Sequence, residues 1–492
     1  MFSLGVFAQA VDDDHRPYNP IPKREFRGVW VHTIEQFYFS ELTSEQIRDT
    51  LRKQLDVFQK CGFNALLFQV RPESDAFYKS DIEPWSRYLT GEQGKAPDDP
   101  DFDPMAFLIE ECHKRCMEFH AWVNPYRVNI NKTKYRLSDN HVYFEHRYMF
   151  FSYGTMLLFN PGVPDSREYI CKVIKDLVSR YDIDALHMDD YFYPYPIKGI
   201  KLPDDQTFKK YGIPAGFKEN QKADWRRDNV NKLVKALSDT IHSVKPWVRF
   251  SISPFGIYRN SNRYIDGSDT NGFTCYDDLY ADVMLWVRNG WIDQCIPQLY
   301  WEDGHRLADY TTLINWWAKN TLAPCKFYVG QDVSRTYMQM NTKMTKAREL
   351  RKVEGNCFFS GKMILENLGG IQDSLQAYQS KPAFPPEYPN IDTHAPAAPT
   401  DLKYEVDSTG ITITWESAET TNPKDEIRYF AIYMFDEDQA INVENMNALR
   451  CVTAENSYFI PADEYVLCKW FVVTAIDRMH NESKPAMVLI DN

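Results

Sequence analysis

Between residue 24 and about residue 375, short runs with strand character alternate with longer runs of helical periodicity. This alternation is typical of parallel α/β folds, in which each helix returns the chain to the start of the next strand. Eight such units predict a closed (β/α)₈ barrel, whose active site lies where the strands end. The predicted strands are residues 27–33, 64–70, 119–125, 185–191, 249–255, 292–301, 326–332 and 356–364.

The runs between these strands carry helix start and stop signals. Residues 44–62 begin at a serine that we expect to be the N-cap, continue with acidic residues and end at a glycine. No G-x-G-x-x-G or G-x-x-x-x-G-K follows any predicted strand, which argues against a nucleotide-binding sheet. Further helices are predicted at residues 103–118, 166–181 and 229–244.

The composition changes after the barrel. Residues 378–399 are rich in proline and small residues and are predicted to be a linker. Residues 400–492 then show alternating strand patterns, which predict a small all-β sandwich and resemble a fibronectin type III module. The expected domains are therefore an N-terminal extension at 1–23, the barrel at 24–377, the linker and the sandwich.

The first ten residues, MFSLGVFAQA, look like the end of a secretory signal peptide. A short apolar run closes with the small-x-small pattern Ala8-Gln9-Ala10, which is typical of a cleavage site. No basic residues precede the run, so a truncated signal peptide and a merely apolar N-terminus both fit. We expect an exported protein that is periplasmic, associated with the outer membrane or extracellular.

Charge and hydropathy exclude two classes of partner. The net charge is −13 and no basic stripe interleaved with aromatic residues appears, so we expect no nucleic acid partner. No stretch reaches the length of about 18 apolar residues that a membrane-spanning helix needs. The ten cysteines are scattered without C-x-x-C or zinc-site spacing, so we expect buried free thiols and predict no metal or other cofactor. The oligomeric state stays open.

Residues of a barrel strand point alternately into the barrel and toward the surrounding helices. In the fourth predicted strand, Leu186 and Met188 are the natural outward pair, which turns His187 and Asp189 inward and puts Asp189 at the C-terminal rim. Asp190 has the opposite parity or already lies in the loop, and a β-bulge would exchange the two aspartates. The same alternation on other strands predicts that the following residues face inward at this rim or follow just beyond it: His32, Gln69, Arg71, Asp75, His120, Trp122, Asn124, Arg127, Ser253, Gln298, Tyr300 and Glu302.

Acidic and aromatic residues gathered at one end of a barrel are suited to glycoside hydrolysis, which needs two carboxylates beside the scissile bond. We expect Asp189 to act as nucleophile or base. Asp190, Glu302 and Asp75 compete for the role of general acid, which requires a raised pKa. The wall on which a sugar would stack is expected to consist of Trp122, Tyr191, Tyr193, Tyr300 and Trp301.

Other sites fit the pattern less well. His120, His187, Asp189 and Asp190 could bind a divalent ion for metal-dependent hydrolysis, but no strand carries an H-x-H pair and no H-E-x-x-H appears. Ser253 stands in SISPFG and not in the G-x-S-x-G turn of serine hydrolases. A glycan-binding barrel without catalysis also stays open, because no carboxylate stands out as the acid partner of Asp189.

Seven collinear stretches resemble the glycosyl hydrolase-like 10 family and together span roughly residues 24–375. They are EFRGVWVHT, GFNALLFQVRPESDAFYKSDIEPWSRYLTGEQG, FHAWVNPYR, FNPGVPDSREYI, DIDALHMDDYFYP, FSISPFGIYRN and IDQCIPQLYW. The resemblance implies an exported bacterial (β/α)₈ glycosidase, with at least one branch acting on peptidoglycan glycan strands stripped of their peptides. Such proteins are numerous in Bacteroides-type bacteria and are commonly lipoproteins, so the resemblance also implies a lipid anchor.

The family pattern, carried over by position, implies which residues line the site. The DALHMDD stretch is also similar to a strand of α-amylase-like barrels, in which the aspartate at the place of Asp189 is the nucleophile. Those barrels carry their acid on the next strand, which here reads SISPFG without a carboxylate, so their full mechanism does not transfer. The implied site residues are Arg71, Asp75, His120, Trp122, Asn124, Arg127, His187, Asp189, Asp190, Ser253, Gln298 and Tyr300.

Overall fold

The computed structural model describes residues 15–436, 438–463 and 470–490. The pattern that predicts a signal peptide, residues 1–10, lies outside the described residues. Within them, eight parallel strands close into a barrel in the order β1-β2-β3-β7-β8-β9-β10-β11, which confirms the predicted (β/α)₈ fold. The strands are β1 (Phe26–Val31), β2 (Ala65–Arg71), β3 (Glu118–Val123), β7 (Ala185–Met188), β8 (Arg249–Ile252), β9 (Gln294–Cys295), β10 (Lys326–Asp332) and β11 (Val353–Phe359).

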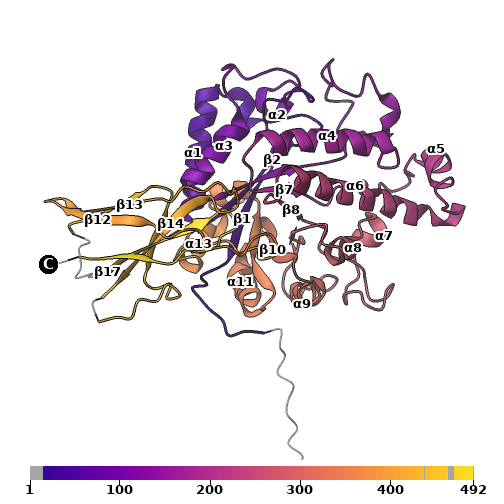
Figure 1. Ribbon diagram of the computed structural model, residues 1–492. Coiled ribbons are helices and arrows are strands. Elements are labelled where there is room, and N and C mark those ends of the chain that lie inside the picture. The colour runs from indigo at the N-terminus through magenta and orange to yellow at the C-terminus, as the bar shows by residue number, and fades with distance from the viewer. Residues whose placement is uncertain (1–14, 437, 464–469, 491–492) are drawn as a thin grey trace, which may run out of the picture.

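Helices surround the barrel (Figure 1). The N-cap of α1 is Thr43, one residue before the predicted serine, because Thr43 and Gln46 exchange reciprocal side-chain-to-backbone hydrogen bonds. Among the described helices, none is long and apolar enough to cross a membrane. The longer helices are α1 (Ser44–Lys60), α3 (Pro104–Lys114), α4 (Pro164–Arg180), α6 (Lys222–Val244), α9 (Tyr310–Asn320), α11 (Met340–Glu349) and α13 (Ile371–Tyr378), and the shorter ones are α2 (Arg87–Thr90), α5 (Asp205–Thr207), α7 (Cys275–Asp278), α8 (Val283–Arg288), α10 (Val333–Thr336) and α12 (Gly361–Leu365).

The alternation of side chains along the barrel strands follows the predicted parity in β7 and departs from it in β2. Leu186 and Met188 belong to the core between barrel and helices, as expected. In β2 the pairing with β3 shifts between Gln69 and Arg71, so Arg71 stands opposite the outward-facing Val123. The predicted inward direction is therefore wrong for Arg71, because a bulge reverses the alternation at the end of this strand.

An insertion after β3 brings one charged residue to the barrel mouth. A small antiparallel sheet with the order β4-β6-β5 follows β3, and Arg127 is the first residue of β4. The Asn124 side chain accepts from the Arg127 backbone N–H at 2.9 Å, which fixes the turn between the two strands. The strands of this sheet are β4 (Arg127–Asn129), β5 (Phe150–Tyr153) and β6 (Met156–Phe159).

The C-terminal region is an all-β domain of two antiparallel sheets that share an apolar core. Trp415 packs edge-on against Phe430 across this core, with ring centroids 5.3 Å apart. The relation to fibronectin type III modules stays a prediction. One sheet is β12 (Thr400–Val406), β13 (Gly410–Glu416) and β16 (Ser457–Pro461), and the other is β15 (Leu449–Thr453), β14 (Ile427–Phe435), β17 (Trp470–Asp477) and β18 (Ala486–Leu489).

The segment predicted as a linker is packed against the floor of the barrel, where the strands begin. Tyr388 is 1% exposed, and its hydroxyl accepts from Gln294 at 2.6 Å and lies 2.8 Å from the Tyr328 hydroxyl. The sandwich contacts the same floor through Arg478, which bonds Asp182 at 2.6 Å. The all-β domain is thus held at the floor of the barrel, opposite the C-terminal ends of the strands (Figure 1).

Candidate active site

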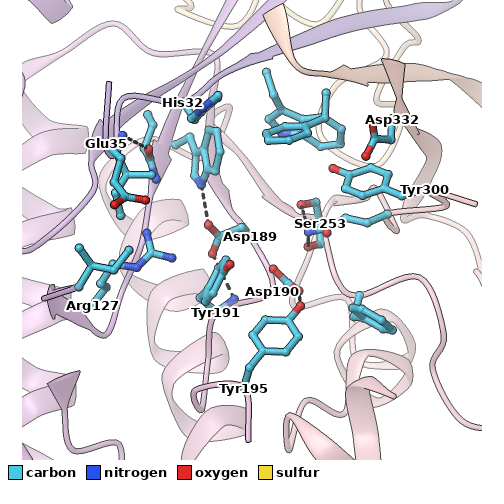
Figure 2. A pocket seen from close by; sticks show the side chains of 18 of the residues that line it. His32, Glu35, Arg127, Asp189, Asp190, Tyr191, Tyr195, Ser253, Tyr300 and Asp332 are labelled. Atoms are coloured by element: carbon cyan, nitrogen blue, oxygen red, sulfur yellow. Dashed lines mark hydrogen bonds between the residues drawn. The ribbon is translucent and has the colours of Figure 1, made fainter. Parts of the chain in front are cut away.

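A cavity of about 390 Å³ opens at the C-terminal mouth of the barrel (Figure 2). Every barrel strand contributes to its wall, either from its last residues or from the residues that directly follow it. In strand order from β1 to β11 these residues are Trp30, Gln69, Trp122, Asp189, Ser253, Gln298, Asp332 and Phe359. A polar cavity at this end, and not a packed layer of aliphatic side chains, is what a barrel enzyme requires.

Asp189 follows directly after β7 and is held by neutral donors. Its carboxylate accepts from the Trp122 indole N–H at 3.2 Å, the Asn124 side-chain amide at 3.1 Å and the Tyr191 backbone N–H at 3.2 Å. Burial raises the pKa of Asp189, and the nearby Arg127 charge and these donors oppose that rise. The group is therefore fixed in place by its donors, which together with Arg127 counter part of the cost of burying its charge, and it lines the cavity.

Asp190 lines the same cavity in a different environment. It is 3% exposed, and the Tyr195 hydroxyl donates to its carboxylate. Burial and the adjacent Asp189 charge raise the pKa of Asp190 to about 6. The pKa values of the two neighbouring carboxyls are thus both raised by burial, but their partners differ, and a difference in surroundings is what can separate an acid from a base.

The structure adds a third carboxylate, Asp332, which was not predicted as a site residue. It ends β10, caps α10 and accepts from the Ser334 hydroxyl at 2.6 Å and the Arg335 backbone N–H at 3.1 Å. Asp332 lines the cavity beside Tyr300, as Figure 2 shows. Its parity matches that of the inward-facing Tyr328, so the alternation applied to residues 326–332 is a signal that could have identified it.

Most of the predicted site residues meet at the cavity. Of the others, Asn124 and His187 lie directly behind the wall as supports. The His187 ring accepts from the Trp30 indole at 3.0 Å and lies 2.8 Å from the Ser251 hydroxyl, so Trp30 and Ser251 fix its orientation. The predicted residues that line the cavity are His32, Gln69, Trp122, Arg127, Asp189, Asp190, Tyr191, Ser253, Gln298, Tyr300 and Trp301.

Five predicted site residues lie away from the cavity wall. Arg71 forms a buried two-point ion pair with Glu83, at 2.6 and 2.7 Å. Asp75 accepts from Gln93 within its own loop. The other three are His120, bonded to Glu118 at 2.9 Å near the floor; Tyr193, buried against Tyr280; and Glu302, exposed in a turn where the chain has left the barrel.

Residues that no pattern identified complete the wall, among them Glu35 and Tyr195 from loops and Arg335 from α10. The positions of the loop residues depend on how each loop returns over the barrel mouth, which local alternation does not encode. The metal hypothesis can also be checked against donor geometry. Within the described residues, no group of three His, Cys, Asp or Glu side chains is placed to hold an ion, and both ring nitrogens of His187 already have partners.

Comparisons with known proteins show which family the chain belongs to. Residues 25–346 match the family model described as glycosyl hydrolase-like 10. The chain is 39% identical over 483 residues to a protein named glycosyl hydrolase YngK from Bacillus subtilis, covering 94% of this chain and 92% of that one. It is 34% identical over 354 residues to glycosyl hydrolase DigH from Escherichia coli K12, covering 68% and 76%. The chain belongs to the glycosyl hydrolase-like 10 family and is a glycoside hydrolase.

Proposed function

We propose that this glycoside hydrolase is exported and cleaves the glycan strands of peptidoglycan after their peptides have been removed. The catalytic pair is Asp189 as nucleophile or base and Asp190 as general acid. The observation that carries the pairing is the difference between two buried carboxyls: three neutral donors and the nearby Arg127 charge counter the rise in pKa at Asp189, whereas the adjacent Asp189 charge adds to the rise at Asp190. The export part rests on the pattern Ala8-Gln9-Ala10.

In this mechanism a sugar ring lies against the aromatic wall of the cavity. Asp190 donates its proton to the glycosidic oxygen as the bond to the anomeric carbon breaks, so the leaving chain departs as a neutral alcohol. Asp189 either bonds to the anomeric carbon or takes a proton from the attacking water. Asn124 and Trp122 keep the Asp189 carboxylate oriented during this step, because both bond it directly.

The substrate part of the proposal is supported by Arg127. Its side chain is 6% exposed and lines the cavity, and its guanidinium carbon lies 4.3 Å from the centre of the Tyr191 ring. The buried Nη1 group has no hydrogen-bond partner among the described residues. A buried cationic donor without a partner is costly unless a ligand satisfies it. A muramic acid unit without its peptide carries a free carboxylate that matches this donor.

The test compares wild type with Asp189→Asn on purified glycan strands, prepared with and without their peptides. We expect wild type to release reducing ends from the peptide-free strands, and Asp189→Asn to release almost none while still binding them. Glu302→Gln is the matched control, because it removes an exposed carboxylate outside the cavity and should leave activity intact. Binding of the strands without any release by wild type would overturn the catalytic assignment, and equal cleavage of peptide-bearing strands would overturn the substrate assignment.

A further inference from the structure

A second cavity, of about 350 Å³, lies directly beside the catalytic one. It sits between the loop after β1, which includes the 3₁₀ helix η1 (Phe37–Glu41), the helix α1 and the segment around α12 that follows β11. His32 lines both cavities and is the side chain that they share. Figure 2 shows His32 at the rim of the catalytic cavity, next to Glu35.

His32 is held in a defined orientation at this shared wall. Its Nε2 atom lies 3.1 Å from the Gln36 side-chain nitrogen, and its ring packs at a tilt against Phe359 with centroids 5.4 Å apart. Burial and the Lys362 charge lower the pKa of His32, so the ring is neutral near pH 7. A neutral ring that accepts from Gln36 at Nε2 carries its proton on Nδ1, which makes His32 a hydrogen-bond donor for a hydroxyl group.

The rest of the second cavity combines aromatic surface with long polar side chains. Tyr38 is 38% exposed, and Phe37 beside it is half-buried. Amide and charged groups stand around these rings, on Gln36, Gln54, Lys362 and Glu366. Aromatic faces combined with directional donors and acceptors are what a pyranose ring needs, since each ring has apolar C–H faces and a rim of hydroxyls. The volume lies in the range of small-ligand sites and is close to that of the catalytic cavity.

We propose that this second cavity binds a further sugar unit of the same glycan chain whose neighbouring unit occupies the catalytic cavity. The inference rests on the proposed function and extends it, because it assigns the enzyme a binding site longer than the bond that it cleaves. His32 stands between the two units and contacts both. The enzyme therefore favours oligosaccharides that are long enough to pass over His32, and the second cavity contributes to binding without taking part in the chemical step.

The test measures cleavage and binding along a length series of peptide-free glycan oligomers. In wild type, kcat/KM rises once the oligomer is long enough to fill the second cavity. Tyr38→Ala removes the exposed ring, and we expect it to lower kcat/KM about tenfold for long oligomers, equivalent to ~1.4 kcal/mol, and to leave the shortest cleaved oligomer unaffected. Lys362→Ala should show the same dependence on length. Tyr264→Ala is the matched control, since Tyr264 is also 38% exposed but lines neither cavity.

A binding arm separates failure of this inference from failure of the proposed function. Affinity for each oligomer is measured by calorimetry on Asp189→Asn and on Asp189→Asn/Tyr38→Ala. Affinity that rises with length in the first variant and not in the second supports the second cavity even if wild type cleaves nothing, an outcome that would overturn only the catalytic proposal. Affinity or kcat/KM that falls equally at every length in Tyr38→Ala, or does not change at any length, would overturn the second cavity.

Discussion

Under the proposed mechanism, the hydrogen bond from the Tyr195 hydroxyl to Asp190 tunes the pKa of the general acid, and Tyr195→Phe tests this. The hydroxyl bonds the ionised carboxylate more strongly than the protonated one and so opposes the rise in pKa that burial and Asp189 cause. The ring itself should stay in place, because it stacks on Phe273 with centroids 5.3 Å apart. Removing the hydroxyl therefore raises the pKa of Asp190 further above about 6.

The size of the shift follows from the energy of the bond. A hydrogen bond to a charged acceptor contributes roughly 1.5–3 kcal/mol, and one pKa unit corresponds to about 1.4 kcal/mol. Part of the bond survives when Asp190 is protonated, so we expect an upward shift of about one unit. A general acid works only while it is protonated. The activity of wild type should therefore fall as the pH rises through about 6, and the fall in Tyr195→Phe should come about one unit higher.

The assay is a profile of kcat/KM against pH, from about pH 4 to pH 9, on peptide-free glycan oligomers. Tyr191→Phe is the control: it removes a hydroxyl from the same cavity but keeps the backbone N–H that bonds Asp189, and it should leave the alkaline limb where it is. The reasoning fails if the alkaline limb of Tyr195→Phe stays in place or moves to lower pH. A uniform loss of activity without a shift would give Tyr195 a role other than tuning Asp190.

Three further changes test other parts of the structure. Asp190→Asn should unfold at a higher temperature than wild type above about pH 6, and at the same temperature below about pH 4. The pKa of the carboxyl is raised from 3.8 to about 6 in the folded protein, so its ionisation destabilises the fold as the pH rises through that interval. The gain in the free energy of unfolding at neutral pH is roughly 2–3 kcal/mol, and an unchanged melting temperature would contradict this prediction. Arg127→Ala should remove the preference of the enzyme for glycans with free carboxylates over carboxyl-reduced glycans. We expect this preference, measured as the ratio of the two kcat/KM values, to be roughly 10–100-fold in wild type. A preserved ratio in the variant would show that Arg127 does not bind the carboxylate. Arg478→Ala should lower the free energy of unfolding by about 2 kcal/mol, because it removes the ion pairs to the partly exposed Asp182 and Glu426. We expect kcat to stay at the wild-type value. Loss of activity in the folded variant would show that the barrel floor influences the site.

Prediction from the sequence worked where periodicity decides the structure. Eight strand-like runs were enough to predict a barrel, and the aliphatic pair Leu186 and Met188 was enough to orient β7, because large apolar side chains must face the helices. Arg71 shows the limit of this reasoning. One extra residue in β2 reverses the alternation of side chains, and no residue pattern in the run 64–70 predicts this bulge.

Residues beyond the strand ends were harder to place. Glu302 shares the parity of Tyr300, but parity has no meaning once the chain leaves the strand, and the side chain turns to solvent. Asp332 is the opposite case. It is the last residue of its strand and has inward parity, so the alternation along residues 326–332 does indicate it. Tyr195 and Glu35 come from loops, whose paths depend on tertiary contacts.

The two ends of the barrel differ in how their buried charged groups are placed. At the floor, Glu118 bonds Arg249 and lies near His120 and His480, and the all-β domain closes over them. Two further N–H groups of Arg249 have no hydrogen-bond partner among the described residues. At the mouth, charges are left partly unpaired, with Asp190 next to Asp189 and a donor of Arg127 without a partner. Unpaired buried charges cost stability and are retained where a ligand or a reaction uses them. Within the described residues, the mouth differs from the floor in that its unpaired groups line a cavity that a ligand can enter, and the function is expected there.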